Sequence, residues 1–212
     1  MTASGEAVRF RWILAAVSMA LFCVQIDYFA VNLALPRMAS DLNSTATGLQ
    51  WVISVYMLAL GAFMVPAGRI GDIFGRRRAL LAGIALFGLS STLAPSATLV
   101  IAFRALQGLG AALIFPVSVS VLTNAFPFVR ASHAIGLAYG IAGLGNAAGP
   151  LIGGLLTETV GWRWIFWLNI PLTLVALASE RAASPNPSTK PCRAAPTSPG
   201  WRSSQSGLAC SR

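Results

Sequence analysis

The chain has 212 residues, of which 56% are hydrophobic and only 10% are charged, and its mean hydropathy is +0.70. Soluble domains carry about 25% charged residues, so this composition excludes a soluble globular domain and predicts a polytopic membrane protein. The formal net charge of +9 is explained by arginines that gather in loops on one side of a membrane and in a basic tail, and we expect no nucleic-acid partner.

Groups suited to catalysis or metal binding are scarce. The three cysteines, Cys23, Cys192 and Cys210, have neither the spacing of a metal site nor that of a disulfide framework. The chain has one histidine and six acidic residues, and His133 is expected to be a solvated loop residue. The sequence therefore predicts no metal, no cofactor and no enzymatic activity.

Six apolar segments have about the length that crosses a bilayer as a helix, roughly 20 residues. They do not alternate apolar and polar residues as barrel strands do, so helices are predicted. The first is too long for the ~7–15-residue apolar core of a signal peptide. The fold class is therefore all-α, a six-helix bundle over 12–178 that follows an N-terminus at 1–11. The predicted spans are 12–35, 49–67, 79–95, 99–126, 134–157 and 164–178.

Arginines predict the orientation, because Lys and Arg are enriched in cytoplasmic loops. An N-terminus inside the cell places seven arginines on the cytoplasmic side and two outside. We therefore expect a multi-pass protein of the cell membrane, in contact with the lipid bilayer, with both termini cytoplasmic. The inner set is Arg9, Arg11, Arg69, Arg76, Arg77, Arg78 and Arg130, and the outer set is Arg37 and Arg163.

The first segment contains CVQIDYFAVNLALP at 23–36, with Asp27 inside the apolar run. An ionisable residue at such a place is a functional candidate by default. Gln25 and Asn32 share a second face of the same helix, so we expect protein around it and a role for all three in proton coupling or substrate binding. The alternative is that Asp27 is a buried, hydrogen-bonded packing residue.

The stretch GRIGDIFGRRR, residues 68–78, separates the second and third segments. Each charge in it would cost about 2.5–3.5 kcal/mol at the bilayer centre, so a tight, basic cytoplasmic hairpin is predicted. Its glycines allow the backbone to turn and to approach neighbouring helices. The residues of interest are Gly68, Asp72, Gly75, Arg76 and Arg77.

The fourth segment carries Arg104 and Gln107 on one helical face. At ~1.5 Å per residue, Arg104 lies roughly 8 Å below the outer surface and Asp27 about 12 Å below it. We therefore expect the two opposite charges to be near neighbours across one cavity. The alternative for Arg104 is snorkelling to the interface.

The fifth segment contains small residues about four positions apart, which permit close helix contact. Pro150 removes a hydrogen bond and bends the helix. Plain tight packing is the alternative to a functional role. The residues are Gly145, Gly149, Pro150, Gly153 and Gly154.

Residues 179–212 change character and become rich in proline, serine and arginine. Such a segment is expected to be disordered. Two interpretations stay open: an ordinary cytoplasmic tail, or the product of a reading frame that was lost or truncated after residue 178.

Several of these motifs resemble those of the major facilitator superfamily, and its drug:proton antiporters with fourteen spans in particular. The hairpin is similar to the loop between the family's second and third helices, but it has Ile73 where the family most often has arginine. The other likenesses are D-x-x-x-x-N-x-A-L-P from Asp27, R-x-x-Q-G-x-G-A from Arg104, G-x-x-x-G-P-x-x-G-G from Gly145, and GWRWIFWLNIP at 161–171. The fifth-segment motif is associated with antiporters rather than symporters.

The resemblance implies the N-terminal half of a transporter built from three-plus-three inverted repeats. It implies that Asp27 and Arg104 couple protons to a small, drug-like substrate, that Asp72 and the following arginines act as a conformational latch, and that Gly145–Gly154 form a bendable seam. The chain alone would be a truncated, inactive half that needs a second half-transporter or a homodimer. A symporter or permease for a small metabolite and a non-transporting membrane subunit remain alternatives.

Overall fold

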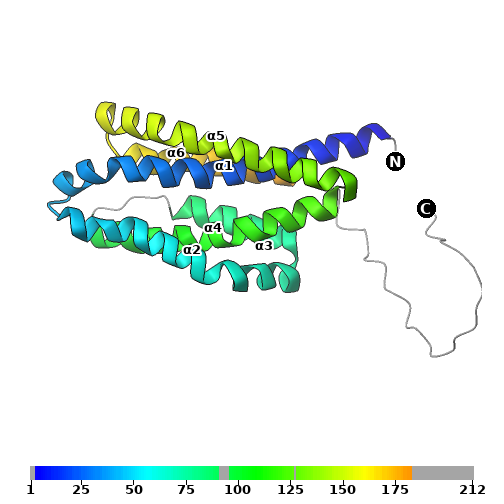
Figure 1. Ribbon diagram of the computed structural model, residues 1–212, viewed down its shortest axis with the longest axis horizontal. Coiled ribbons are helices and arrows are strands. Elements are labelled where there is room, and N and C mark those ends of the chain that lie inside the picture. The colour runs from blue at the N-terminus through cyan, green and yellow to red at the C-terminus, as the bar shows by residue number, and fades with distance from the viewer. Residues whose placement is uncertain (1–2, 91–95, 127, 183–212) are drawn as a thin grey trace, which may run out of the picture.

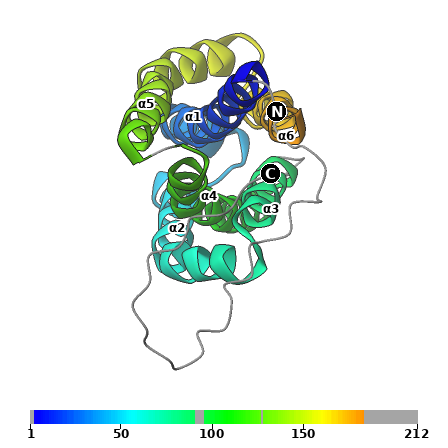
Figure 2. The same ribbon diagram turned by 90° about the vertical axis from the view of Figure 1, so that its right-hand side faces the viewer.

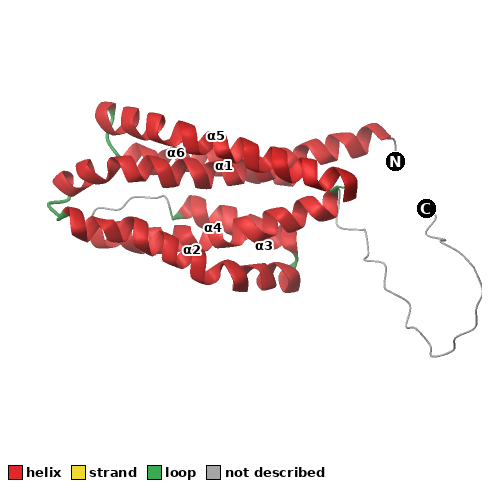
Figure 3. Cartoon of the chain, in the orientation of Figure 1, coloured by secondary structure: helices red, strands yellow, loops and turns green. Residues whose placement is uncertain are grey.

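The computed structural model describes residues 3–90, 96–126 and 128–182, which form six helices and, within these ranges, no strand (Figures 1 and 3). Helices follow because a backbone in lipid must satisfy its own hydrogen bonds. Their bounds are α1 Ala3–Asp41, α2 Ala46–Phe74, α3 Arg76–Leu89, α4 Ala97–Ala125, α5 Phe128–Thr159 and α6 Arg163–Ala182.

The helices form two groups of three that meet along α1 and α4. Viewed along the bundle, α1 lies between α5 and α6, and α4 lies between α2 and α3 (Figure 2). Each central helix thus packs mainly on two helices from the other half of the sequence. This exchange of partners is what an inverted repeat of three helices produces.

Four helices have the length and apolarity to cross a membrane, judged on the described residues: Phe10–Asp41 in α1, Thr47–Phe74 in α2, α4, and Arg130–Thr159 in α5. The other two fall short of the same criteria. Helix α3 has 14 residues and ends at Leu89, and part of the predicted span 79–95 lies outside the described residues. Helix α6 has 20 residues, with charged residues near both ends.

Apart from the one between α3 and α4, the connections are shorter than the sequence predicts, because helices continue through the predicted breaks. Helix α1 runs through Pro36 to Asp41, since one missing N–H is tolerated in a long helix. The basic hairpin turns at Gly75 alone, with φ +95°, a backbone conformation that favours glycine. Helix α5 begins at Phe128, so the prediction of a loop around His133 is wrong: this residue is exposed on the helix.

Side chains cap two of the helices. Thr45 accepts a hydrogen bond from the backbone N–H of Gly48 at 3.1 Å, at the start of α2. Ser96 does the same for Leu99 at the start of α4. These caps satisfy N–H groups that have no partner within the helix. Both mark the end of the bundle at which Asp27 and Arg104 were predicted to lie close to the surface.

Candidate functional site

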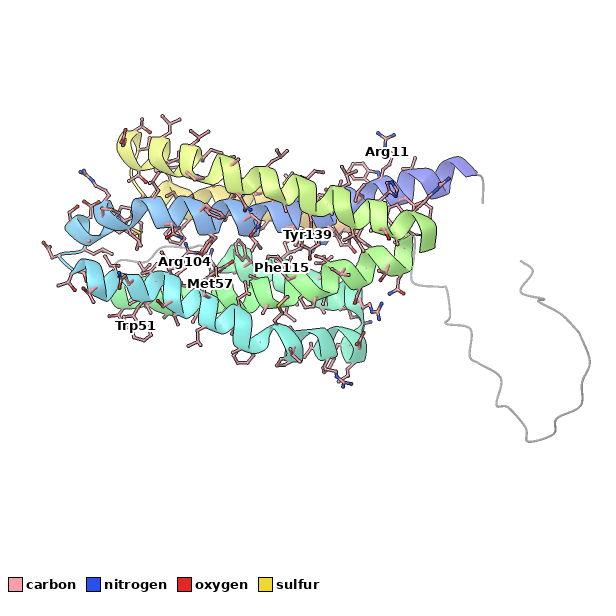
Figure 4. The ribbon with its side chains drawn as sticks, viewed as in Figure 1. Arg11, Trp51, Met57, Arg104, Phe115 and Tyr139 are labelled. Atoms are coloured by element: carbon pink, nitrogen blue, oxygen red, sulfur yellow. The ribbon has the colours of Figure 1, made fainter. Side chains whose placement is uncertain are left out.

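Asp27 on α1 and Arg104 on α4 form a buried ion pair where the two groups of helices meet. The side chains are 0% and 2% exposed, and Arg104 Nη1 donates to Asp27 Oδ2. Figure 4 shows Arg104 on the side of α4 that faces α1. The two residues that were expected at similar depth are therefore in contact.

Two amides complete a polar cluster, which we define as Asp27, Arg104, Gln107 and Asn169. Arg104 Nη1 also donates to Gln107 Oε1 at 3.0 Å, and Gln107 Nε2 donates to Asp27 Oδ1 at 3.4 Å. From α6, Asn169 Nδ2 donates to the same Oδ1. The carboxylate of Asp27 therefore accepts from three side chains on two helices.

Two aromatic rings face the guanidinium of Arg104. Its Cζ lies 5.3 Å from the centroid of the Tyr56 ring on α2 and 5.1 Å from that of Phe166 on α6. A cation within about 6 Å of a ring face is attracted by the ring quadrupole, by up to about 2 kcal/mol when desolvated. The rings thus supply Arg104 with a stabilising environment that does not depend on the charge of Asp27.

Stability does not explain why this pair is buried. The desolvation of two ions roughly offsets their attraction, so an apolar replacement of a buried pair is often neutral or stabilising. An acid and a base held inside a membrane bundle are instead a candidate for proton or ion movement. Within the residues that the structure describes, no group of His, Cys, Asp and Glu is arranged to hold a metal.

The structure separates two of the five residues predicted for this site. Asn32 is exposed, and its Nδ2 donates to the backbone carbonyl of Tyr28 in the same helix at 3.3 Å. Gln25 is half-buried and lies against Gly145 of α5. Both lie on the other face of α1, as their spacing from Asp27 indicates.

Three residues around the pair were not predicted from the sequence: Asn169, Tyr56 and Phe166. A signal for Asn169 was present, because a polar residue six positions into the sixth segment lies about 9 Å below the same surface. That depth matches Arg104. The two rings carry no such signal, since aromatic residues are common on every face of membrane helices.

The basic hairpin ties four helices together at the opposite end of the bundle. Asp72 accepts from Arg76 Nε at 3.2 Å and Nη2 at 3.1 Å, and Arg76 Nη1 donates to the carbonyl of Ser120 on α4 at 3.2 Å. Arg77 Nε lies 3.3 Å from Glu180 Oε1 on α6. Burial raises the pKa of the Glu180 carboxyl above its ordinary value, and Arg77 opposes that rise.

The hairpin glycines differ in how closely they approach α4. At Gly71, an added Cβ would lie 2.9 Å from a methyl of Val117. At Gly68 it would lie 3.8 Å from Cβ of Pro116, which is ordinary contact. Ile73, where the family pattern has arginine, is 75% exposed. The hairpin therefore lacks the positive charge that an arginine would carry at position 73.

The glycines of α5 form a seam against α1, defined by Gly145, Gly149 and Gly153. A Cβ at Gly153 would lie 2.6 Å from Cα and 2.7 Å from the carbonyl oxygen of Ala30. The backbones touch there, so no side chain fits. Gly154 faces the side chain of Leu33, and Pro150 is exposed on the far side of the helix.

Two groups of three helices around a buried ionisable pair match the inverted-repeat architecture of many secondary transporters. The chain belongs to the Major Facilitator Superfamily, whose family profile matches residues 17–204. The match extends past residue 178, where the sequence predicts that a tail begins.

Known relatives include a resistance and export protein, a resistance protein and a riboflavin transporter. A tetracenomycin C resistance and export protein of Streptomyces glaucescens is 38% identical over 78% of this chain and 31% of its own length. A puromycin resistance protein of Streptomyces alboniger is 41% identical over 84% of the chain and 36% of its own length. A riboflavin transporter of Clostridioides difficile is 32% identical over 79% of this chain and 38% of its own length. The chain thus spans about a third of the length of these relatives.

Proposed function

We propose that these six helices are the N-terminal half of a proton-coupled exporter that expels drugs or other small molecules by antiport. The observation that carries this proposal is the buried contact between Asp27 and Arg104. Relatives that are 38% and 41% identical and are named for antibiotic resistance support export. We further propose a protein of the cell membrane with both termini in the cytoplasm. The arginine-rich hairpin lies at the end of the bundle where α1 begins (Figure 1), which supports a cytoplasmic position for that end.

A proton that binds Asp27 neutralises the carboxylate and breaks its ion pair with Arg104. The guanidinium then keeps its charge, stabilised by Gln107 Oε1 and by the rings of Tyr56 and Phe166. Since the pair joins α1 to α4, its loss loosens the contact between the two groups of helices. In this proposal the binding of a proton and the binding of substrate favour different arrangements of the helices and so exclude each other, which is the requirement of antiport.

Two further sets of residues are proposed to take part in the conformational change of transport. The seam between α5 and α1 permits the helices to move in close contact, with Pro150 as a point of bending. The hairpin, through Asp72, Arg76 and Arg77, latches the inner ends of the helices in one state. Both assignments rest on the contacts of these residues and on the family resemblance.

Transport requires a second wall for the substrate cavity. Helices α2 and α5 carry large exposed apolar side chains, among them Leu58, Val65, Leu151 and Leu155, which are 65%, 78%, 75% and 65% exposed. Lipid covers some of this surface, and a second half-transporter or a second copy of the chain covers the rest. The chain alone, in vesicles, is expected to transport nothing; proton-dependent efflux from such vesicles would overturn this part of the proposal.

A chimera tests the function. Residues 1–178 replace the corresponding segment of the tetracenomycin C exporter, and efflux of that antibiotic is measured in a sensitive host. We expect efflux that a protonophore abolishes and that Asp27→Asn eliminates at an unchanged membrane level. A chimera that reaches the membrane at the parent's level without exporting, or that exports equally well with Asp27→Asn, would contradict the proposal.

A permease for a metabolite is the second candidate, because one relative is named a riboflavin transporter. The same ion pair serves either direction of transport. Uptake of riboflavin by an equivalent chimera built on that relative, together with failure of the export chimera, would favour it.

A further inference from the structure

We propose that Asn169 accepts a hydrogen bond from Asp27 when Asp27 is protonated. The two side chains would then be hydrogen-bonded in both charge states of Asp27. The inference rests on the proposed function, because it concerns how the same site holds a proton. Asn169 is a positioning residue: it acts through Asp27.

A buried acceptor without a partner distinguishes Asn169 from the other members of the polar cluster. The residue is 1% exposed, and its Nδ2 donates to Asp27 Oδ1. Its Oδ1 is buried and has no hydrogen-bond partner among the described residues. A buried acceptor without a partner is destabilising, which suggests that another state of the protein uses it.

Once protonated, Asp27 requires a hydrogen-bond acceptor, which Arg104 and Gln107 do not provide. A carboxylate only accepts hydrogen bonds, but a protonated carboxyl has an O–H that must donate. Arg104 has donors alone. Gln107 Oε1 already accepts from Arg104, so turning this amide would point its NH₂ group at the guanidinium.

Asn169 can provide this acceptor if its side-chain amide flips. The flip brings Oδ1 to the place of Nδ2, where it accepts from the new O–H of Asp27. An amide oxygen and nitrogen occupy nearly the same space, so no other atom has to move. The O–H bond of Asp27 forms as an O–H bond of a hydronium ion breaks and water is released, and the cluster gains one positive charge, which remains on Arg104.

The infrared spectrum of the full chain in detergent tests this assignment. The difference between spectra at acidic and neutral pH contains the C=O stretch of each carboxyl that takes up a proton, and subtraction of the Asp27→Asn spectrum identifies the band of Asp27. In Asn169→Leu, an apolar side chain of similar size, we expect the Asp27 band to shift to higher wavenumber because its O–H loses an acceptor. Asn169→Ser, whose hydroxyl both donates and accepts, should return the band toward the wild-type position.

Thr173→Val is the matched control on the same helix. Thr173 is buried one turn further along α6, and its hydroxyl donates within the helix to the carbonyl of Asn169 at 2.8 Å. The substitution preserves shape and should leave the Asp27 band in place. Circular dichroism and monodisperse elution verify that each variant is folded, and Asn169→Ala, which also lacks an acceptor, replaces Asn169→Leu as the probe if the latter is not.

The outcomes separate this inference from the proposed function. An Asp27 band that is unchanged in Asn169→Leu, or that shifts equally in Thr173→Val, overturns the role of Asn169 and leaves proton binding by Asp27 intact. A wild-type spectrum without any band that depends on Asp27 contradicts the proposed function itself, and the role of Asn169 with it.

Discussion

Arg104 donates to Asp27 at the place where α1 and α4 pass each other, so one ion pair joins the two groups of three helices. The residues are 77 positions apart in sequence. The pair is surrounded by amides and rings rather than by other charges. Within the described chain it is the fully buried ion pair between the two groups, in contrast to the pair of Arg77 and Glu180, whose arginine is 45% exposed.

Removal of one partner of this pair should destabilise the bundle far more than removal of both. Arg104→Leu leaves the carboxylate of Asp27 buried without its cation, which typically costs about 3–5 kcal/mol. The double variant Asp27→Asn, Arg104→Leu removes both charges and should recover most of that loss. Thermal unfolding in detergent of the two single variants and the double variant measures the coupling, and strictly additive changes would speak against a direct pair.

The charge-swapped variant Asp27→Arg, Arg104→Asp tests the same contact through function. In the export chimera, either single reversal should abolish efflux, and the swap should restore part of it. No restoration at all, with the swapped protein present in the membrane, would count against direct contact during transport.

The α5–α1 seam should not accept even one methyl group at Gly153. Its Cβ would meet the backbone of Ala30 at 2.6–2.7 Å, so Gly153→Ala forces the helices apart and should lower the unfolding temperature. Gly143, on the same helix, has nothing within 4 Å of the corresponding position. Gly143→Ala should be neutral or stabilise by up to ~1 kcal/mol through helix propensity; equal effects of the two changes would refute the seam.

The hairpin contacts should contribute modestly to stability. The Arg76 and Asp72 side chains are 37% and 57% exposed, and pairs of this kind contribute about 0.2–1 kcal/mol. Arg76→Ala also removes a hydrogen bond to Ser120 on α4. The matched variant Arg78→Ala removes an exposed arginine of the same turn and should have less effect on unfolding. A larger loss with Arg78→Ala would contradict the assigned contacts.

Glu180 should make stability depend on pH in a defined direction. Burial raises its pKa above the ordinary 4.5, against the opposing effect of Arg77. The folded state then binds this proton more tightly than the unfolded state. The stabilisation is complete below the ordinary pKa and is lost as the pH rises through the raised pKa. Glu180→Gln should flatten the unfolding temperature across that acidic range, and an unchanged pH profile would show that Glu180 is not the group responsible.

The sequence predicted the features of this protein that depend on composition and spacing. Uninterrupted apolar segments without alternation predicted an all-α membrane bundle, and the similar depths of Asp27 and Arg104 predicted their proximity. Both rest on rules that hold for any helix in a bilayer, the length of a span and a rise of ~1.5 Å per residue. The roles of these residues in proton coupling stay predictions.

Features that depend on packing were not predicted. A helix that continues beyond the hydrocarbon region looks like a loop in composition, which is why the segment around His133 was assigned wrongly. The neighbours of the Asp27–Arg104 pair on α2 and α6 depend on how these helices rotate about their axes. Spacing along one helix does not determine that rotation, so Tyr56, Phe166 and Asn169 emerged only from the structure.

Proton release on substrate binding tests the central claim most directly. The purified export chimera is mixed with tetracenomycin C in weakly buffered detergent, and a pH-sensitive dye records the protons that leave the protein. We expect release from the chimera and none from its Asp27→Asn variant. Equal release from both proteins would contradict the assignment of the transported proton to Asp27.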